Sequence, residues 1–116
     1  MDEAAFTEAL IAGIRNAELE RYCLLPDGGL EAVTSHLQVG FDVEAIRRDK
    51  ASPGGIKASH AQRRMLSLLI ALWRPGVVDT LFDDGLAALP RAVMAMDARN
   101  RAILAELIES YPGWDD

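Results

Sequence analysis

The sequence predicts an all-α fold, a compact bundle of five to seven helices that forms a single domain over residues 1–116. Apolar residues recur at three- and four-residue spacings near both ends of the chain. A serine–glutamine pair precedes the longest apolar run, and clusters of proline and glycine separate the helical segments. The chain is 50% apolar and 26% charged, a balance that suits a globular domain of this length.

The first helix is expected over residues 2–23. Asp2 and Glu3 are favourably placed at its positive end. Residues 26–29 then supply one proline and two glycines, which turn the chain. The apolar stripe of this helix consists of Phe6, Leu10, Ile14 and Ala17.

Two alternatives remain open for residues 30–50. Leu30, Val33 and Leu37 follow helical spacing, whereas residues 37–44 alternate between apolar and polar, which is typical of a half-buried strand. A single strand without a partner is unstable, so we favour two short helices broken at Gly40. Asp42 would cap the second of them, over residues 43–49. Minor β content between residues 37 and 44 is the alternative.

The best-marked helix begins after a loop at residues 51–55. Ser59 stands three residues before Gln62, a spacing that predicts a capping box in which each side chain satisfies a backbone donor of the other. The run that follows, residues 65–73, is almost entirely apolar, so we expect this helix to be buried on most sides. Its Leu69 and Leu72 should sit in the core.

The C-terminal part is expected to contain two or three further helices. Arg74, Pro75 and Gly76 end the central helix, and residues 77–89 should form a short helix and a turn. Pro90 suits the first position of a helix over residues 91–96, and Asp97 can cap a last helix over residues 98–110. The alternative is one continuous helix across Asp97. The stripe of the last helix consists of Ile103, Leu104, Leu107, Ile108 and Tyr111.

No catalytic or metal-binding motif appears in the sequence. His36 and His60 have no Cys, Asp or Glu at metal-ligand spacing on a helix, which favours a structural or solvent-facing role for both. Cys23 is the only cysteine, so no intramolecular disulfide can form, and it is interpreted as a small buried hydrophobe. We therefore expect no enzyme, no metal and no cofactor.

The charge distribution supplies the candidate binding residues. Residues 45–64 hold six bases against the single acid Asp49, a local balance of +5, while the whole chain carries −6 and the remainder therefore −11. Such a patch is either a solvated surface or a binding site for an anion, an acidic partner or nucleic acid. Lys57 also leads into the helix that begins at Ser59, where free backbone donors favour an anion. The candidate residues are Arg47, Arg48, Lys50, Lys57, Arg63 and Arg64.

One further pattern lies in the second half of the chain, and its residues are Ala71, Leu72, Trp73, Phe82, Asp83, Leu89, Asp97, Tyr111 and Pro112. In these residues the chain resembles a family of small uncharacterised proteins carried on bacterial integrative and conjugative elements. The resemblance covers about residues 59–112 and implies no activity. It implies a source in a bacterial mobile element or prophage.

These observations predict a small non-enzymatic protein-binding module, such as an adaptor, an immunity-type protein or a host-defence inhibitor. The alternative is a nucleic-acid-associated accessory protein that uses the basic residues between 47 and 64. The first ten residues carry three acids and no base, unlike a signal peptide. The longest apolar run is roughly half of the ~20 residues that a membrane span requires, so we expect a cytoplasmic protein.

Overall fold

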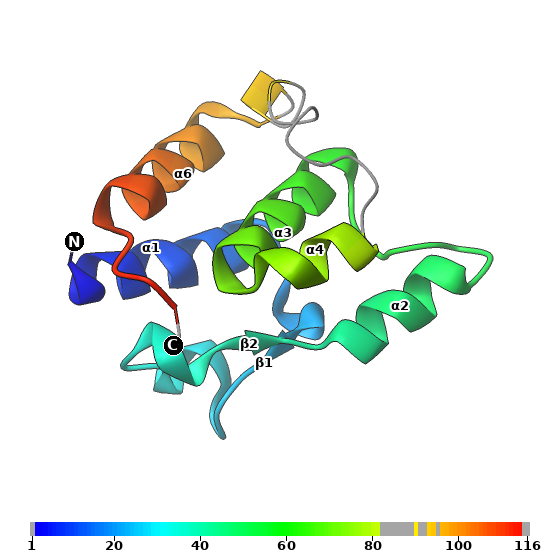
Figure 1. Ribbon diagram of the computed structural model, residues 1–116, viewed down its shortest axis with the longest axis horizontal. Helices are drawn as coiled ribbons and strands as arrows, with labels where there is room; N and C mark the ends of the chain where they lie inside the picture. The colour runs from blue at the N-terminus through cyan, green and yellow to red at the C-terminus, as the bar shows by residue number, and fades with distance from the viewer. Residues whose placement is uncertain (1, 82–89, 91–92, 95, 115–116) are drawn as a thin grey trace.

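The computed structural model describes residues 2–81, 90, 93–94 and 96–114, and these are mostly helical (Figure 1). The described residues form five α-helices, the lower end of the predicted five to seven, and a two-stranded sheet. The radius of gyration is 13.3 Å, close to the value of about 13 Å that is usual for a chain of this length. The predicted all-α, compact architecture is therefore confirmed.

Helix α1 (Glu3–Asn16) begins where the sequence indicates, because the Asp2 carboxylate accepts from the backbone N–H of Ala5 at 3.1 Å. The helix ends well before the predicted Cys23, however. Glu18 adopts a φ of 56°, a left-handed conformation that stops a helix. The predicted stripe faces the core, and all four of its side chains are buried: Phe6, Leu10, Ile14 and Ala17.

The small sheet corrects the first of the two helices preferred between residues 30 and 50, whereas the second, capped by Asp42, is confirmed. Strand β1 (Cys23–Leu24) pairs antiparallel with strand β2 (Gly40–Phe41). The strand at residues 40–41 therefore does have a partner, which is β1 at the end of the predicted first helix. Three short 3₁₀ turns replace the remaining helical expectation: η1 (Glu20–Tyr22), η2 (Gly29–Ala32) and η3 (His36–Gln38).

Helix α2 (Val43–Ala51) follows the sheet directly, and the Asp42 carboxylate caps it by accepting from the N–H of Ala45 at 3.0 Å. Tyr22 anchors this helix. Its buried hydroxyl donates to Oδ2 of Asp49 at 2.6 Å and accepts from the backbone N–H of Lys57 at 2.8 Å. Burial and the hydrogen bond to Asp49 raise the pKa of Tyr22, so the phenol keeps its proton and holds α2 to the loop before α3.

Helix α3 (His60–Trp73) has the predicted capping box at its start. The N–H of Gln62 donates to Oγ of Ser59 at 3.2 Å, and the N–H of Ser59 donates to Oε1 of Gln62 at 2.7 Å. The helix is less enclosed than expected. Leu69 is fully buried, but Leu72 only packs against the edge of the core, so its predicted core position is corrected.

Helix α4 (Pro75–Leu81) starts one residue after the end of α3. Arg74 between them is extended, with φ −149° and ψ 92°, as the residue before a proline prefers. The α4 start lies slightly before the short helix that was expected within residues 77–89. The turn expected at residues 83–85, and most of the helix expected over residues 91–96, lie outside the described residues.

Helix α6 (Ala98–Ser110) packs along α1 (Figure 1). Asp97 is extended and caps it, because its carboxylate accepts from the N–H of Asn100 at 2.8 Å, so a continuous helix across Asp97 is wrong. Gly13 allows the close approach, since a Cβ there would lie 3.3 Å from Cγ2 of Ile103. Of the predicted stripe, Ile108 turned out to be 64% exposed.

Leu69→Ala should lower the free energy of unfolding by about 2–5 kcal/mol, because it leaves a cavity in the middle of the core. Leu72→Ala should cost roughly 1–2 kcal/mol, since part of its surface already meets water. Urea denaturation of both variants measures the difference. Equal losses at the two positions would contradict the burial described for α3.

Ser59→Ala should lower the free energy of unfolding by roughly 0.5–2 kcal/mol, because the first turn of α3 loses a hydrogen-bond acceptor. Ser59→Asp retains an acceptor and should restore most of that stability. Thermal denaturation of the two variants is the measurement. A neutral Ser59→Ala variant would show that α3 does not depend on this cap.

Candidate functional site

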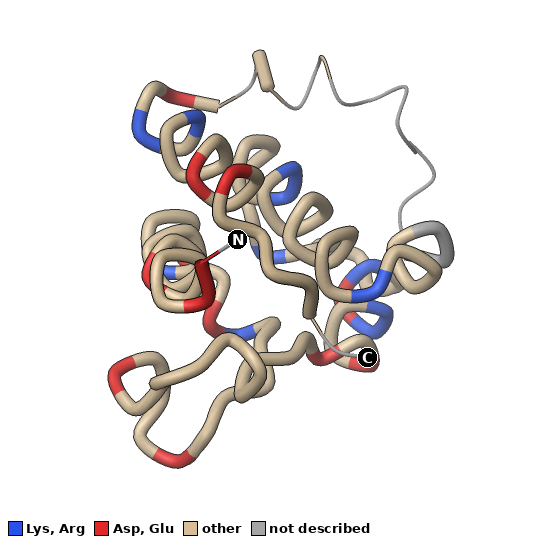
Figure 2. The backbone as a smooth tube through the Cα atoms, turned by 60° about the vertical axis from the view of Figure 1, so that its left-hand side comes forward, with Lys and Arg blue, Asp and Glu red and all other residues tan. Residues whose placement is uncertain are grey.

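The predicted basic residues lie on three consecutive segments. Arg47, Arg48 and Lys50 belong to α2, Lys57 to the following loop, and Arg63 and Arg64 to the first turns of α3. Arg64 is half-buried and the other five are exposed. In the view of Figure 2 basic and acidic segments are interspersed along the tube, with no uniformly basic side.

Several of these cations already have partners. Arg47 lies 3.6 Å from the carboxylate of Glu44, and Arg48 lies 3.7 Å from that of Asp49. Lys50 donates from Nζ to the carbonyl of Leu81 at the end of α4. Each of the three basic side chains of α2 therefore already interacts with a carboxylate or a carbonyl of the same molecule.

The anion site considered at the start of α3 has an acidic neighbour. The capping box uses the N–H of Gln62, and the amide Nε2 of Gln62 donates to the carboxylate of Glu18 at 3.4 Å. A carboxylate at this position repels an approaching anion. The backbone N–H of Lys57 is bonded to the hydroxyl of Tyr22.

The part of the chain that the structure describes contains no cluster of three potential metal ligands. The thiol of Cys23 donates to the carbonyl of Leu19 at 3.3 Å. Burial, together with the charge of Glu20, raises the pKa of Cys23 to about 12. The thiol therefore remains protonated and unreactive at neutral pH.

His36 has a structural position. Its side chain is 1% exposed, and the centroid of its ring lies 5.1 Å from that of Phe6 and 5.8 Å from that of Trp114. Nε2 lies 3.0 Å from the carbonyl of Gly113, and because a carbonyl only accepts, the ring hydrogen sits on Nε2. His36 thus fastens the C-terminal segment to η3.

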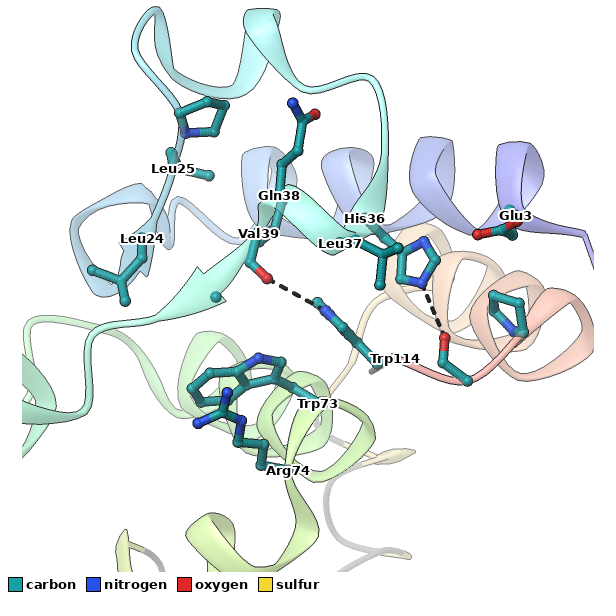
Figure 3. Close-up of a pocket in the computed structure, with 14 residues that line it drawn as sticks. Glu3, Leu24, Leu25, His36, Leu37, Gln38, Val39, Trp73, Arg74 and Trp114 are labelled. Carbon is teal, nitrogen blue, oxygen red and sulfur yellow. Dashed lines mark hydrogen bonds between the residues drawn. The ribbon is translucent and has the colours of Figure 1, made fainter. Parts of the chain in front are cut away.

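An open cleft of about 760 Å³ lies beside this histidine (Figure 3). Four segments and one residue of α1 line it: residues 24–26, 36–40, 73–74 and 112–114, and Glu3. We call it the Trp73 cleft. Two of its leucines, which would normally be buried, stand in solvent: Leu24 is 53% exposed and Leu37 is 60% exposed.

Trp73 and Arg74 form one wall of the cleft. The indole packs edge-on against Phe41, with 5.4 Å between ring centroids, and Cζ of Arg74 lies 4.5 Å above the indole ring. Arg74 is exposed, and among the described residues no carboxylate lies within ion-pair distance of it. The guanidinium is therefore held in place by a cation–π contact while its hydrogen-bond donors face solvent.

The C-terminal segment forms the facing wall. Trp114 is buried, and its Nε1–H donates to the carbonyl of Val39 at 3.3 Å. The hydroxyl of Tyr111 donates to the carbonyl of Leu72 at 2.7 Å, which ties the same segment to α3.

Gly40 leaves the space between the walls open. A Cβ at this position would meet Cζ2 of Trp73 at 3.5 Å and Cδ1 of Leu24 at 3.7 Å, which are ordinary contacts. The backbone here does not require glycine, because Gly40 is not among the residues with positive φ. A side chain at position 40 is therefore compatible with the fold but would occupy the cleft.

The sequence did not point to this cleft. Trp73 was expected in a helix buried on most sides, and Leu24 lay between the predicted first helix and the turn at residues 26–29. The lining segments are far apart along the chain, so no local spacing marks them. The one signal is Trp73-Arg74 directly before Pro75, where the chain must leave the helix with both side chains near the surface.

No helix in the described part of the chain combines the length and apolar character needed to cross a membrane. Comparison with protein families, with curated proteins and with solved structures gives no match to this chain. The resemblance to proteins of integrative and conjugative elements therefore stays a prediction.

Proposed function

We propose that the chain is a non-enzymatic, cytoplasmic protein-binding module of a bacterial mobile element, acting as an adaptor, an immunity-type protein or a host-defence inhibitor. The observation that carries the proposal is the Trp73 cleft with its exposed leucines. Binding would take place there by occupation of the cleft, without chemical change of the partner.

The composition of the cleft supports a macromolecular partner. Tryptophan and arginine are the residue types that most often dominate the free energy of protein–protein binding, and Trp73 and Arg74 stand next to each other on one wall. Leu24 and Leu37 expose apolar surface that a partner would remove from water, at about 25 cal/mol per Å². The cleft is open to solvent, which suits a protein segment better than an enclosed small ligand.

The polar groups of the cleft support binding more than catalysis. Its ionisable side chains are Glu3, His36 and Arg74. His36 commits its ring hydrogen to Gly113 and is closed off by aromatic rings. Among the described residues that line the cleft there is no Ser, Thr, Cys or Lys side chain that a base could activate as a nucleophile.

Gly40→Val should abolish partner binding while leaving the fold intact, because its methyl groups would occupy the part of the cleft beside Trp73 and Leu24, and valine suits a strand. A photo-reactive residue placed at Leu37 should cross-link a partner in cells that express the protein naturally. These adducts should disappear in the Gly40→Val background.

The matched control is Ala105→Val, which adds similar apolar bulk at an exposed position of α6. It should leave the cross-links unchanged, and both variants should unfold cooperatively. Adducts that persist in the Gly40→Val background would show that the cleft is not the binding site.

The alternative function is binding of nucleic acid by the basic residues, and a binding assay separates it from the proposed function. We expect no measurable binding to duplex or single-stranded DNA or RNA near physiological salt, because the rest of the chain carries −11 and repels phosphates. Fluorescence anisotropy over a salt series is the measurement. Binding that weakens steeply with salt, and that is lost when Arg47, Arg48, Arg63 and Arg64 are all replaced by glutamine, would favour the alternative.

A further inference from the structure

We infer that the segment recognised by the Trp73 cleft is a peptide of a partner protein in which an acidic side chain neighbours a large apolar one. The acidic side chain would pair with Arg74, and the apolar one would fill the space above Gly40. This inference rests on the proposed function and specifies its partner.

Arg74 is prepared for a carboxylate. The ring of Trp73 holds one face of its guanidinium at 4.5 Å, and Phe41 in turn fixes the ring. The edges of a stacked guanidinium remain available, and they match the two oxygens of a carboxylate. Because the side chain is already positioned, little conformational entropy is lost on binding.

The charges of the cleft select where the acid binds. Figure 3 shows Glu3 and Arg74 on opposite sides of the cleft, with His36 and Trp114 between them. A carboxylate is attracted at the Trp73 side and repelled at the Glu3 side, so the peptide has a preferred direction. Among the described residues that line the cleft, Arg74 is the one Lys or Arg, and an acidic segment therefore gains most there.

The apolar neighbour follows from the space beside Arg74. Gly40 contributes no side chain, and the atoms around its missing Cβ belong to the indole of Trp73 and to Leu24. The atoms nearest to this position are all carbon, so the surface directly around it is apolar. A large aliphatic or aromatic side chain would cover it, and would do so within reach of Arg74 because Trp73 and Arg74 are adjacent.

A phage-displayed library of random linear peptides tests the inference on the intact chain. Peptides selected on the wild-type protein should share an Asp or Glu next to a bulky apolar residue, and Gly40→Val should bind none of them. For a selected peptide synthesised with an amidated C-terminus, Arg74→Gln should weaken binding on the order of tenfold, or about 1.4 kcal/mol. Arg99→Gln, at an exposed position of α6 that does not line the cleft, should leave the affinity unchanged.

A double-mutant cycle assigns the pair. Replacing the acid of the peptide with its amide should cause the same loss as Arg74→Gln, and the two changes together should cost little more than either alone. Peptides that depend on Gly40 but show no acidic preference would overturn this inference and leave the proposed function standing. Loss of binding on amidation alone would assign the charge to a chain terminus and overturn the side-chain pairing. Selected peptides that bind Gly40→Val equally well would overturn the proposed function as well.

Discussion

The structure depends on one chain of aromatic contacts that joins the two ends of the sequence to the sheet. Phe6 of α1 meets His36 and Trp114 edge-on, with centroids 5.1 and 5.5 Å away, and Phe41 of β2 meets Trp114 at 6.1 Å. Edge-to-face packing of this kind adds about 0.5–1.5 kcal/mol per pair to the burial of the rings. Helix α1, the neighbouring η3 and β2, and the C-terminal segment are thereby held in one arrangement.

The candidate site is a by-product of that arrangement. Phe41 continues the aromatic chain to Trp73, so the wall that carries Arg74 is supported from the core. On the other wall, Trp114 is fixed by its ring contacts and by its bond to Val39. Both walls of the cleft are therefore packed against the core, whereas the exposed leucines at its rim are not.

Local features of the fold could be predicted from the sequence, and remote ones could not. The caps at Ser59 and Asp97 were found because each cap and its partner are three residues apart. The pairing of Cys23 with Phe41 escaped prediction because two-residue strands leave too short a pattern, and their partner lies a whole loop away. Periodicity also predicted too much burial for Leu72 and Ile108. It identifies the apolar face of a helix, but it does not show how far the neighbouring element covers that face.

The candidate residues show the same limit. Charge counting identified six basic residues, of which five are exposed and Arg64 is half-buried, but it could not show that Lys50 bonds to the end of α4. The cleft combines residues from positions 3 to 114, and its existence depends on how those segments pack.

At position 40, a residue that would stabilise the fold would also occupy the cleft that glycine leaves open. Most side chains would suit an extended residue there better than glycine does, since glycine loses more conformational entropy on folding. Selection for thermal tolerance alone would therefore favour filling this position, and each gain in heat resistance would erode the binding surface. If related sequences keep glycine at this position as they diverge, selection for binding has outweighed selection for thermal stability.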